Sequence, residues 1–195
     1  MIKPSIDRLF DFQKFLYDFR SIKRVIHFPN KEIENDIEHS YSLAMTAWYI
    51  ASYFPELKKD NLIRYALVHD LIEVHAGDTY IYGNPEHLAT KPAREAAALE
   101  QIKQDWSDFS DMIDDIEIYE RHDTPESAFI YALDKIMPIF QIYIADGYTW
   151  KHKSITVEML DSKKRSKVAA SPVIKDYYQQ LYDLLLKSPH LIAAR

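Results

Sequence analysis

The chain contains no cysteine and only three glycines among its 195 residues. Without cysteine there is neither a disulfide framework nor a thiolate metal ligand, so any metal ion must be held by histidine, aspartate or glutamate. The low glycine content argues against a β protein rich in turns and favours helices joined by short connections.

The sequence also lacks any apolar stretch that approaches the roughly 20 residues of a membrane-spanning helix. Its N-terminal segment is charged and amphipathic and has no small-residue cleavage site, which argues against a secretory signal peptide. These absences predict a cytoplasmic protein without a membrane partner.

An excess of positive charge is missing as well. The formal net charge is −6 at pH 7, which disfavours a nucleic-acid polymer as partner because phosphate backbones are bound by clustered lysine and arginine. The one basic run, Lys163, Lys164, Arg165 and Lys167, is short, and we interpret it as a solvated helix face.

Hydrophobic residues make up 47% of the sequence. Within several segments they recur at helical spacing. Thr124 before Pro125 and Ser171 before Pro172 are typical helix starts. We expect helices over roughly residues 6–24, 36–54, 61–76, 92–106, 110–120, from 125 onward, 155–168 and 172–188. No segment predicts a β-strand, so the expected fold is all-α, a single compact domain over residues 1–195.

Residues 68–78 place three polar side chains in an otherwise apolar helical run. Glu73 follows His69 by four residues and Asp70 by three, so all three side chains occupy one sector of a helix. Gly77 suits the end of that helix, because glycine adopts positive φ without strain. Burying an imidazole and two acids is costly unless they are compensated, for instance by a metal ion. The ordinary alternative is a set of hydrogen-bonded core polar groups.

Four residues could supply a metal site: His39, His69, Asp70 and Asp134. Each lies in an expected helix with apolar surroundings, and two imidazoles with two carboxylates suit a divalent transition metal. If the metal is five- or six-coordinate, water and a phosphate oxygen could bind as well. The irregular segment 78–91 beside this helix is long enough to be a functional loop.

A second His-Asp pair, His122-Asp123, indicates that the dipeptide alone is a weak signal. It lies in a polar break before the expected cap Thr124, and we interpret it as a loop or helix end without a catalytic role. The first pair differs because it lies within an apolar helix and has Glu73 one turn later.

The spacing of His39, His69-Asp70 and Asp134 resembles the HD-domain metal-dependent phosphohydrolase superfamily. The resemblance extends to its 5′-nucleotidase branch, which includes bacterial 5′-deoxynucleotidases and their eukaryotic relatives. It spans about residues 8–150, whereas residues 151–195 add nothing specific. The segments that carry it are 38–40 (EHS), 69–73 (HDLIE), 77–78 (GD), 91–96 (KPAREA) and 133–135 (LDK). The resemblance implies a helical HD-domain bundle.

The resemblance also implies one divalent transition metal ion (Mn, Co, Ni, Zn or Fe) held by the four residues of that pattern. Glu73 and Asp78 would be the acidic residues that act beside the metal, and Arg24 would bind the substrate phosphate. Each of the three has an ordinary alternative role. Arg24 could cap a helix C-terminus, Glu73 could orient a ligand histidine, and Asp78 could cap a turn.

The sequence departs from that branch at Val25, where the bacterial enzymes have a tryptophan that helps to exclude ribose. A smaller side chain leaves more room, so the preference for 2′-deoxyribose is an open question. The loop over residues 79–90 also differs in composition, which leaves the base preference open.

The first hypothesis is therefore a phosphomonoesterase that removes the 5′-phosphate from small (deoxy)nucleoside monophosphates. A second is a dinuclear HD-domain phosphodiesterase or oxygenase, which would need further histidines such as His75, His87 or His122. A third is a non-catalytic helical module with a structural metal. The 14 tyrosines and nine phenylalanines could also supply a homodimer interface.

Overall fold

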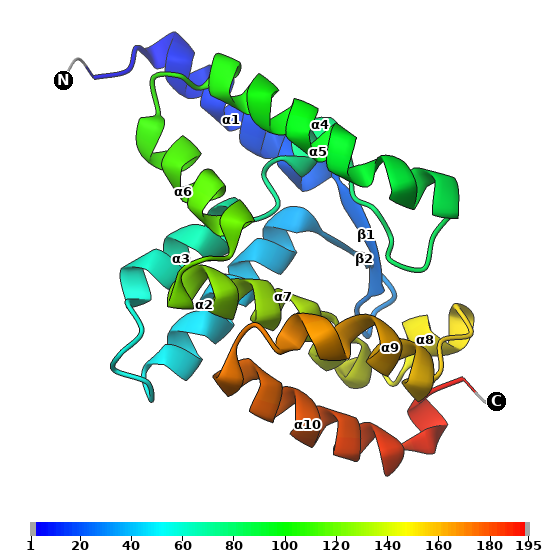
Figure 1. Ribbon diagram of the computed structural model, residues 1–195. Helices are drawn as coiled ribbons and strands as arrows, with labels where there is room; N and C mark the ends of the chain where they lie inside the picture. The colour runs from blue at the N-terminus through cyan, green and yellow to red at the C-terminus, as the bar shows by residue number, and fades with distance from the viewer. Residues whose placement is uncertain (1–2, 194–195) are drawn as a thin grey trace.

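The computed structural model describes residues 3–193 of the chain. Its helices surround a central one, α7, which contacts α2, α3, α6, α9 and α10 (Figure 1). The helices are α1 (Ile6–Ser21), α2 (Asp36–Ala51), α3 (Lys59–Val68), α4 (Glu73–Ala76), α5 (Pro85–Asp105), α6 (Ser110–Arg121), α7 (Pro125–Ile144), α8 (Tyr148–His152), α9 (Val157–Val168), α10 (Pro172–Leu186) and the 3₁₀ helix η1 (Pro189–Leu191). The strands are β1 (Lys23–His27) and β2 (Ile33–Asn35).

The predicted all-α class is confirmed, but the expectation that no segment forms a strand is wrong. β1 and β2 pair antiparallel in a two-stranded hairpin directly after α1. The strands have five and three residues, too few for the alternation of a half-buried strand to stand out in the sequence. The hairpin matters for the site because it carries Arg24 and Glu34 into the interior.

The expected continuous helix through residue 76 is also wrong. α3 ends at Val68, and residues 69–72 form turns before α4 begins at Glu73. The backbone N–H of Leu71 donates to the carbonyl of Val68 at 3.1 Å, and that of Glu73 to Asp70 at 2.9 Å. These bonds span three residues rather than four, which is the tighter 3₁₀ pattern. His69 and Asp70 therefore lie in a turn between two helices.

The loop after this turn is shorter than predicted. α5 begins at Pro85, where the side chain of Asn84 accepts a hydrogen bond from the N–H of Glu86 at 2.8 Å. Pro92, which we expected at the start of the helix, lies inside it. The start predicted at Thr124 is confirmed, because its side chain accepts from the N–H of Ser127. α8 was not predicted.

Buried hydrophobic residues form two clusters, one on each side of the turn after α3. The larger cluster includes Leu43 and Leu133 and joins α2, α3, α7, α9 and α10. The smaller one includes Val68, Leu71 and Ile102 and joins α1, α5 and α6 to the turn. The polar residues of interest lie at the boundary between these clusters. Within residues 3–193, no helix has both the length and the hydropathy that crossing a membrane requires.

Candidate functional site

The structure brings the four candidate metal ligands together from three segments. His39 lies in the first turns of α2, Asp134 lies midway along α7, and His69 and Asp70 lie in the turn after α3. The Nε2 atom of His39 is 2.9 Å from Asp134 Oδ1, and His69 Nε2 is 2.9 Å from Asp70 Oδ2 and 4.0 Å from Asp134 Oδ1. His39 is fully buried, and His69 is only 1% exposed.

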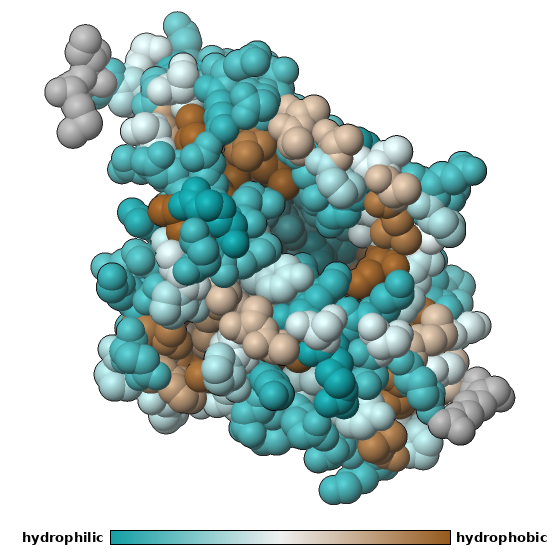
Figure 2. Space-filling view, in the orientation of Figure 1, coloured by the Kyte–Doolittle hydropathy of each residue, from teal (hydrophilic) through white to brown (hydrophobic). Residues whose placement is uncertain are grey.

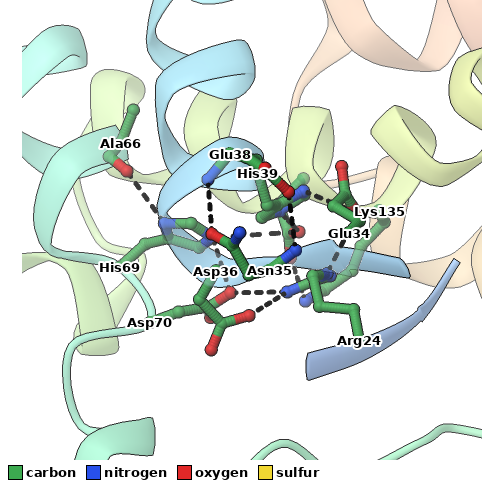
Figure 3. A network of polar contacts seen from close by, with 11 residues as sticks. Arg24, Glu34, Asn35, Asp36, Glu38, His39, Ala66, His69, Asp70 and Lys135 are labelled. Carbon is green, nitrogen blue, oxygen red and sulfur yellow. Dashed lines mark hydrogen bonds and ion pairs between the residues drawn. The ribbon is translucent and has the colours of Figure 1, made fainter. Parts of the chain in front are cut away.

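The two imidazoles differ in what their other nitrogen contacts. The Nδ1 of His69 is 2.9 Å from the carbonyl oxygen of Ala66, a pairing in which Nδ1–H donates (Figure 3). The Nδ1 of His39 lies 3.8 Å from Oε2 of Glu34. The carbonyl of Ala66 therefore fixes the ring of His69, as in metal sites where a carbonyl orients the ligand histidine, whereas Nδ1 of His39 makes no hydrogen bond among residues 3–193. In both rings Nε2 faces the central acids.

These residues fit a divalent metal ion. His69 Nε2 has no hydrogen-bond partner despite its short distance to Asp70, so lone pairs of nitrogen and carboxylate oxygen face one another in a buried space. Ligand atoms of His39, His69 and Asp70 all lie within 4.8 Å of one another. Atoms bound about 2.0–2.2 Å from one ion have such spacing, and its charge would offset the lone-pair repulsion.

The structure places Arg24 among carboxylates, a detail that the sequence did not predict. Its Nη1 is 2.9 Å from Asp70 Oδ2 and 3.3 Å from Asp36 Oδ1, and its Nε is 3.4 Å from Glu34 Oε2. Figure 3 shows the side chain reaching from β1 towards Asp36 and Asp70. Arg24 thus already neutralises part of the negative charge of this site. It also lines the adjoining cleft.

Sequence reasoning missed Glu34 and Asp36, which are both fully buried. Asn35 and Glu38 form a capping box that starts α2, and this pattern is visible in the sequence. A capping box does not, however, show that the acids at residues 34 and 36 point inward. Their burial depends on the β-hairpin, which brings Arg24 to them.

The histidines and the two central acids have pKa values displaced by their surroundings. At His69, burial alone would lower the pKa, but the contact with Asp70 outweighs burial and raises it. Burial, and then nearby Arg24, lower the pKa of His39 to about 4, so its imidazole is neutral at pH 7 and able to bind metal. Burial alone would raise the pKa of Asp70 and Asp134. His69 outweighs this at Asp70, and Lys135 and His39 outweigh it at Asp134, so both pKa values fall below the ordinary range. Both acids are carboxylates at neutral pH.

The surrounding acids behave differently. Burial raises the pKa of Glu34 and of Asp36 to about 7, and at Asp36 the charge of Asp70 adds to the effect. Burial, followed by the charge of Asp70, raises the pKa of Glu73 well above its usual value. Burial likewise raises the pKa of Asp78. More negative charge is gathered here than Arg24 compensates, which favours binding of a cation.

Glu73 and Asp78 lie on the cleft, beside the central acids. Both line the same cavity as Asp70 and Asp134. Glu73 is 6% exposed, and its Oε2 has no hydrogen-bond partner. Carboxylate oxygens of Asp36, Asp70 and Glu73 also lie within 4.8 Å of one another, so a second group of acids shares Asp70 with the first.

The site opens into a cleft of about 230 Å³. One part is apolar and includes Ile81, Tyr82 and Trp150, whereas the polar part holds the acids, Arg24 and several lysines. Figure 2 shows the surface hollowed between α5 and α9, with hydrophobic residues along one side. Val25 lines the cleft as well. The cleft can therefore receive a small molecule that has an apolar portion and an anionic portion.

The remaining histidines of the dinuclear hypothesis do not join the candidate ligands. His75 is exposed and lies 3.6 Å from Asp105, and His87 lies beside Arg94. The ring of His122 packs against Tyr131 at a centroid distance of 4.0 Å. None of the three belongs to a metal-like group among residues 3–193.

Known proteins resemble the chain in both sequence and fold. The family model described as "HD domain" matches residues 17–175. The chain is 31% identical over 139 residues to the 5′-deoxynucleotidase HDDC2 of Xenopus laevis, a match that covers 68% of this chain and 67% of that protein. A crystal structure described as a predicted metal-dependent phosphohydrolase from Magnetospirillum magnetotacticum MS-1 matches with a TM-score of 0.79 and 26% identity over 100% of both chains.

Proposed function

The chain belongs to the HD-domain family of metal-dependent phosphohydrolases, and within this family we propose that it is a 5′-nucleotidase acting on nucleoside monophosphates. In this proposal the whole chain forms one HD domain. The observation that carries it is the convergence of His39, His69, Asp70 and Asp134 beside a small-molecule cleft that the two aspartates line.

We assign those four residues as ligands of one divalent transition metal. When bound, such an ion supplies Lewis-acid stabilisation of the phosphate charge and lowers the pKa of water. The neutral imidazole of His39 and the carboxylates of Asp70 and Asp134 are in the protonation states that metal binding needs. Zn, Mn, Co, Ni and Fe all suit this donor set.

The three flanking residues act on protons and phosphate oxygens in this proposal. Glu73, buried and with a free carboxylate oxygen, accepts a proton from the water that attacks phosphorus. Asp78, whose pKa is raised, gives a proton to the leaving 5′-oxygen. Arg24 holds a phosphate oxygen through Nη2, because its polar contacts within residues 3–193 use Nη1 and Nε. The products are a nucleoside and inorganic phosphate.

The nucleotide class is supported by the Xenopus relative, which is a 5′-deoxynucleotidase. The cleft offers an apolar part for a base and a polar part for phosphate. Val25 lines the cleft next to Arg24, and its small side chain leaves room for a 2′-hydroxyl. We therefore propose that the enzyme accepts both deoxyribonucleotides and ribonucleotides.

One observation favours a second candidate, a dinuclear centre. Asp36, Asp70 and Glu73 could hold a second ion that shares Asp70 with the first. Arg24 contacts Asp36 and Asp70 at this position and already supplies a positive charge there. For this reason we favour the mononuclear site.

Metal content and phosphate release together test the proposal. The protein is reconstituted separately with Mn, Co, Ni, Zn, Fe and Mg, and the bound ion is counted by mass spectrometry. Phosphate release is then measured on a panel of ribonucleoside and deoxyribonucleoside 5′-monophosphates. We expect about one ion per chain and phosphate release with comparable rates for both sugars.

Two ions per chain at full activity would instead favour the dinuclear candidate. An absence of phosphate release from every nucleotide with every metal would overturn the nucleotidase proposal. A strict preference for deoxyribose would overturn only the role given to Val25.

A further inference from the structure

The basic run on α9 is not the solvated face that the sequence suggested. Lys163 and Arg165 are exposed, but Lys164 is only 7% exposed and Lys167 is half-buried. Lys164 and Lys167 both line the cleft together with Leu160. Residues spaced by three and four positions share one helix face, so α9 turns a basic face towards the candidate active site.

These two lysines have no acidic partner. The Nζ of Lys164 donates a hydrogen bond to the backbone carbonyl of Lys135 on α7, which satisfies one of its three N–H groups. Within the described part of the chain, neither Lys164 nor Lys167 has a carboxylate within 4.0 Å. By contrast, Lys91 lies 3.1 Å from Glu95. A buried ammonium without a counter-charge is costly unless a ligand supplies one.

Two further lysines face the same space. Lys91 of α5 and Lys135 of α7 line the cleft with the α9 pair, and the charge of Lys135 acts on both Lys164 and Lys167. Burial, partly offset by Asp134, lowers the pKa of Lys164 to about 7. Four lysine side chains from three helices therefore line one space, and an anion bound there would favour the charged form of Lys164 and relieve the repulsion among them.

Part of the positive charge that lines the cleft has no acidic partner within residues 3–193. Among the residues that the structure describes, five cationic and four acidic side chains line it. A bound divalent metal would add two positive charges, and one phosphate monoester carries at most two negative charges. Arg24 is shared among Glu34, Asp36 and Asp70, Lys91 pairs with Glu95 and Lys135 pairs with Asp134. The positive charge without an acidic partner in the described chain is therefore that of Lys164 and Lys167.

We propose that Lys164 and Lys167, together with Lys91 and Lys135, form a second anion subsite, and that the preferred substrates are nucleotides carrying a second phosphate group. The proposal rests on the proposed function for the position of the scissile phosphate at the metal site. The two subsites are close, because Lys135 Nζ lies 2.5 Å from Asp134 Oδ2 while Asp134 Oδ1 lies 2.9 Å from His39. One small molecule can therefore reach both.

Binding measurements test the subsite without relying on turnover. Adenosine 5′-monophosphate and adenosine 3′,5′-bisphosphate are titrated by calorimetry into Mn-loaded Glu73→Gln protein, in which hydrolysis is expected to be strongly slowed. We expect the bisphosphate to bind at least about tenfold more tightly, because its second phosphate gains charge-assisted hydrogen bonds. Adding Lys167→Gln should bring the two affinities within about twofold of each other.

The matched control is Lys163→Gln, an equal loss of charge on the exposed side of α9, which should leave the ratio of affinities unchanged. Lys164→Met tests the buried lysine, and circular dichroism shows whether that variant folds. If it does not, the half-buried Lys167 still decides the outcome. Equal affinities for the two ligands, or a preference that survives Lys167→Gln, would overturn the subsite.

The subsite and the proposed function can fail separately. Phosphate release from monophosphates without any preference for bisphosphate binding would remove the subsite and leave the nucleotidase in place. A lysine-dependent preference for the bisphosphate, in a protein that releases phosphate from no monophosphate, would keep the subsite and remove the nucleotidase.

Discussion

The chain contains the pattern His-Asp-x-x-Glu twice, and the two copies have different roles. In residues 69–73, His69 and Asp70 approach to 2.9 Å, and Asp70 and Glu73 line the cleft. In residues 122–126, the ring of His122 packs against Tyr131, and Asp123 pairs with Arg121 at the surface, with both side chains more than half exposed. Glu126 is buried and accepts a hydrogen bond from the backbone N–H of Lys58 at 3.0 Å.

Local backbone structure separates the two copies. Residues 69–72 continue in tight right-handed turns between α3 and α4. The side chains of His69, Asp70 and Glu73 therefore stay together. His122 has a left-handed backbone with φ 51°, and Thr124 is extended before Pro125 starts α7. This break directs the histidine, the aspartate and the glutamate to three different places. Glu126 then supports the start of α3 instead of a reaction.

The comparison teaches that distant partners, and not the motif, make the site. The first copy meets His39, Asp134 and Arg24, which come from α2, α7 and β1. The second copy meets aromatic rings and a surface arginine. Substitutions made in parallel at both copies can test this difference.

The two aspartates, Asp70 and Asp123, are expected to differ most in the effect of substitution. Asp70→Asn removes the charge of a proposed ligand, one that belongs to both groups of residues that could hold a metal ion. We expect loss of the bound metal and a fall in phosphate release of at least about 10⁴-fold, because everything the ion supplies is lost. The same change at exposed Asp123 should alter neither metal content nor rate. A metal-free Asp70→Asn protein that keeps its activity would contradict the role given to the first copy.

The two glutamates, Glu73 and Glu126, are expected to show a smaller difference, one that affects the rate but not the metal content. Glu73→Gln should retain the metal ion and lower kcat by about 10²- to 10³-fold, because the amide cannot accept a proton from water. Glu126→Gln keeps a side-chain oxygen for the N–H of Lys58, so both rate and metal content should stay near those of the parent. Mass spectrometry for the metal and initial rates of phosphate release separate the two variants. Loss of metal in Glu73→Gln would instead assign Glu73 to the ligand set.

The residues of this candidate site could be named from the sequence, because they lie in segments with strong sequence signals. His39 lies in the first turns of an amphipathic helix, and Asp134 lies in an apolar one that starts at a clear Thr-Pro signal. The structure places both beside His69 and Asp70, as the sequence predicted. The exact end of α3 was not predictable, because tight turns and α-helix share the same local residue preferences.

The parts that sequence missed depend on tertiary contacts. Glu34 and Asp36 are buried only because a five-residue strand and a three-residue strand pair in front of α2. Lys164 and Lys163 are neighbours of the same type, and only the packing of α9 against α7 decides which is buried. Likewise, the equal spacing in residues 69–73 and 122–126 carries no information about the helix break at His122. Composition and periodicity alone do not reveal such differences.

The smallest difference is expected in folding stability, at the arginine beside each copy. Arg24 is enclosed by Glu34, Asp36 and Asp70, two of which are fully buried. Arg24→Gln leaves those acids without their cation, so we expect the metal-free protein to lose about 3–5 kcal/mol of unfolding free energy. Arg121→Gln breaks only an exposed pair with Asp123, which is worth less than about 1 kcal/mol.

Urea denaturation of both metal-free variants measures these losses, and metal loading then tests their origin. Because a bound ion also offsets the negative charge around Asp70, loading should recover part of the stability of Arg24→Gln and none of that of Arg121→Gln. Equal losses in the two variants would show that the buried acids are protonated in the metal-free protein. The pKa values of Glu34 and Asp36 are both raised to about 7, so this outcome can be tested by varying the pH. If the acids are protonated in the metal-free protein, the stability lost in Arg24→Gln should grow as the pH rises through 7, because the acids then ionise without their cation.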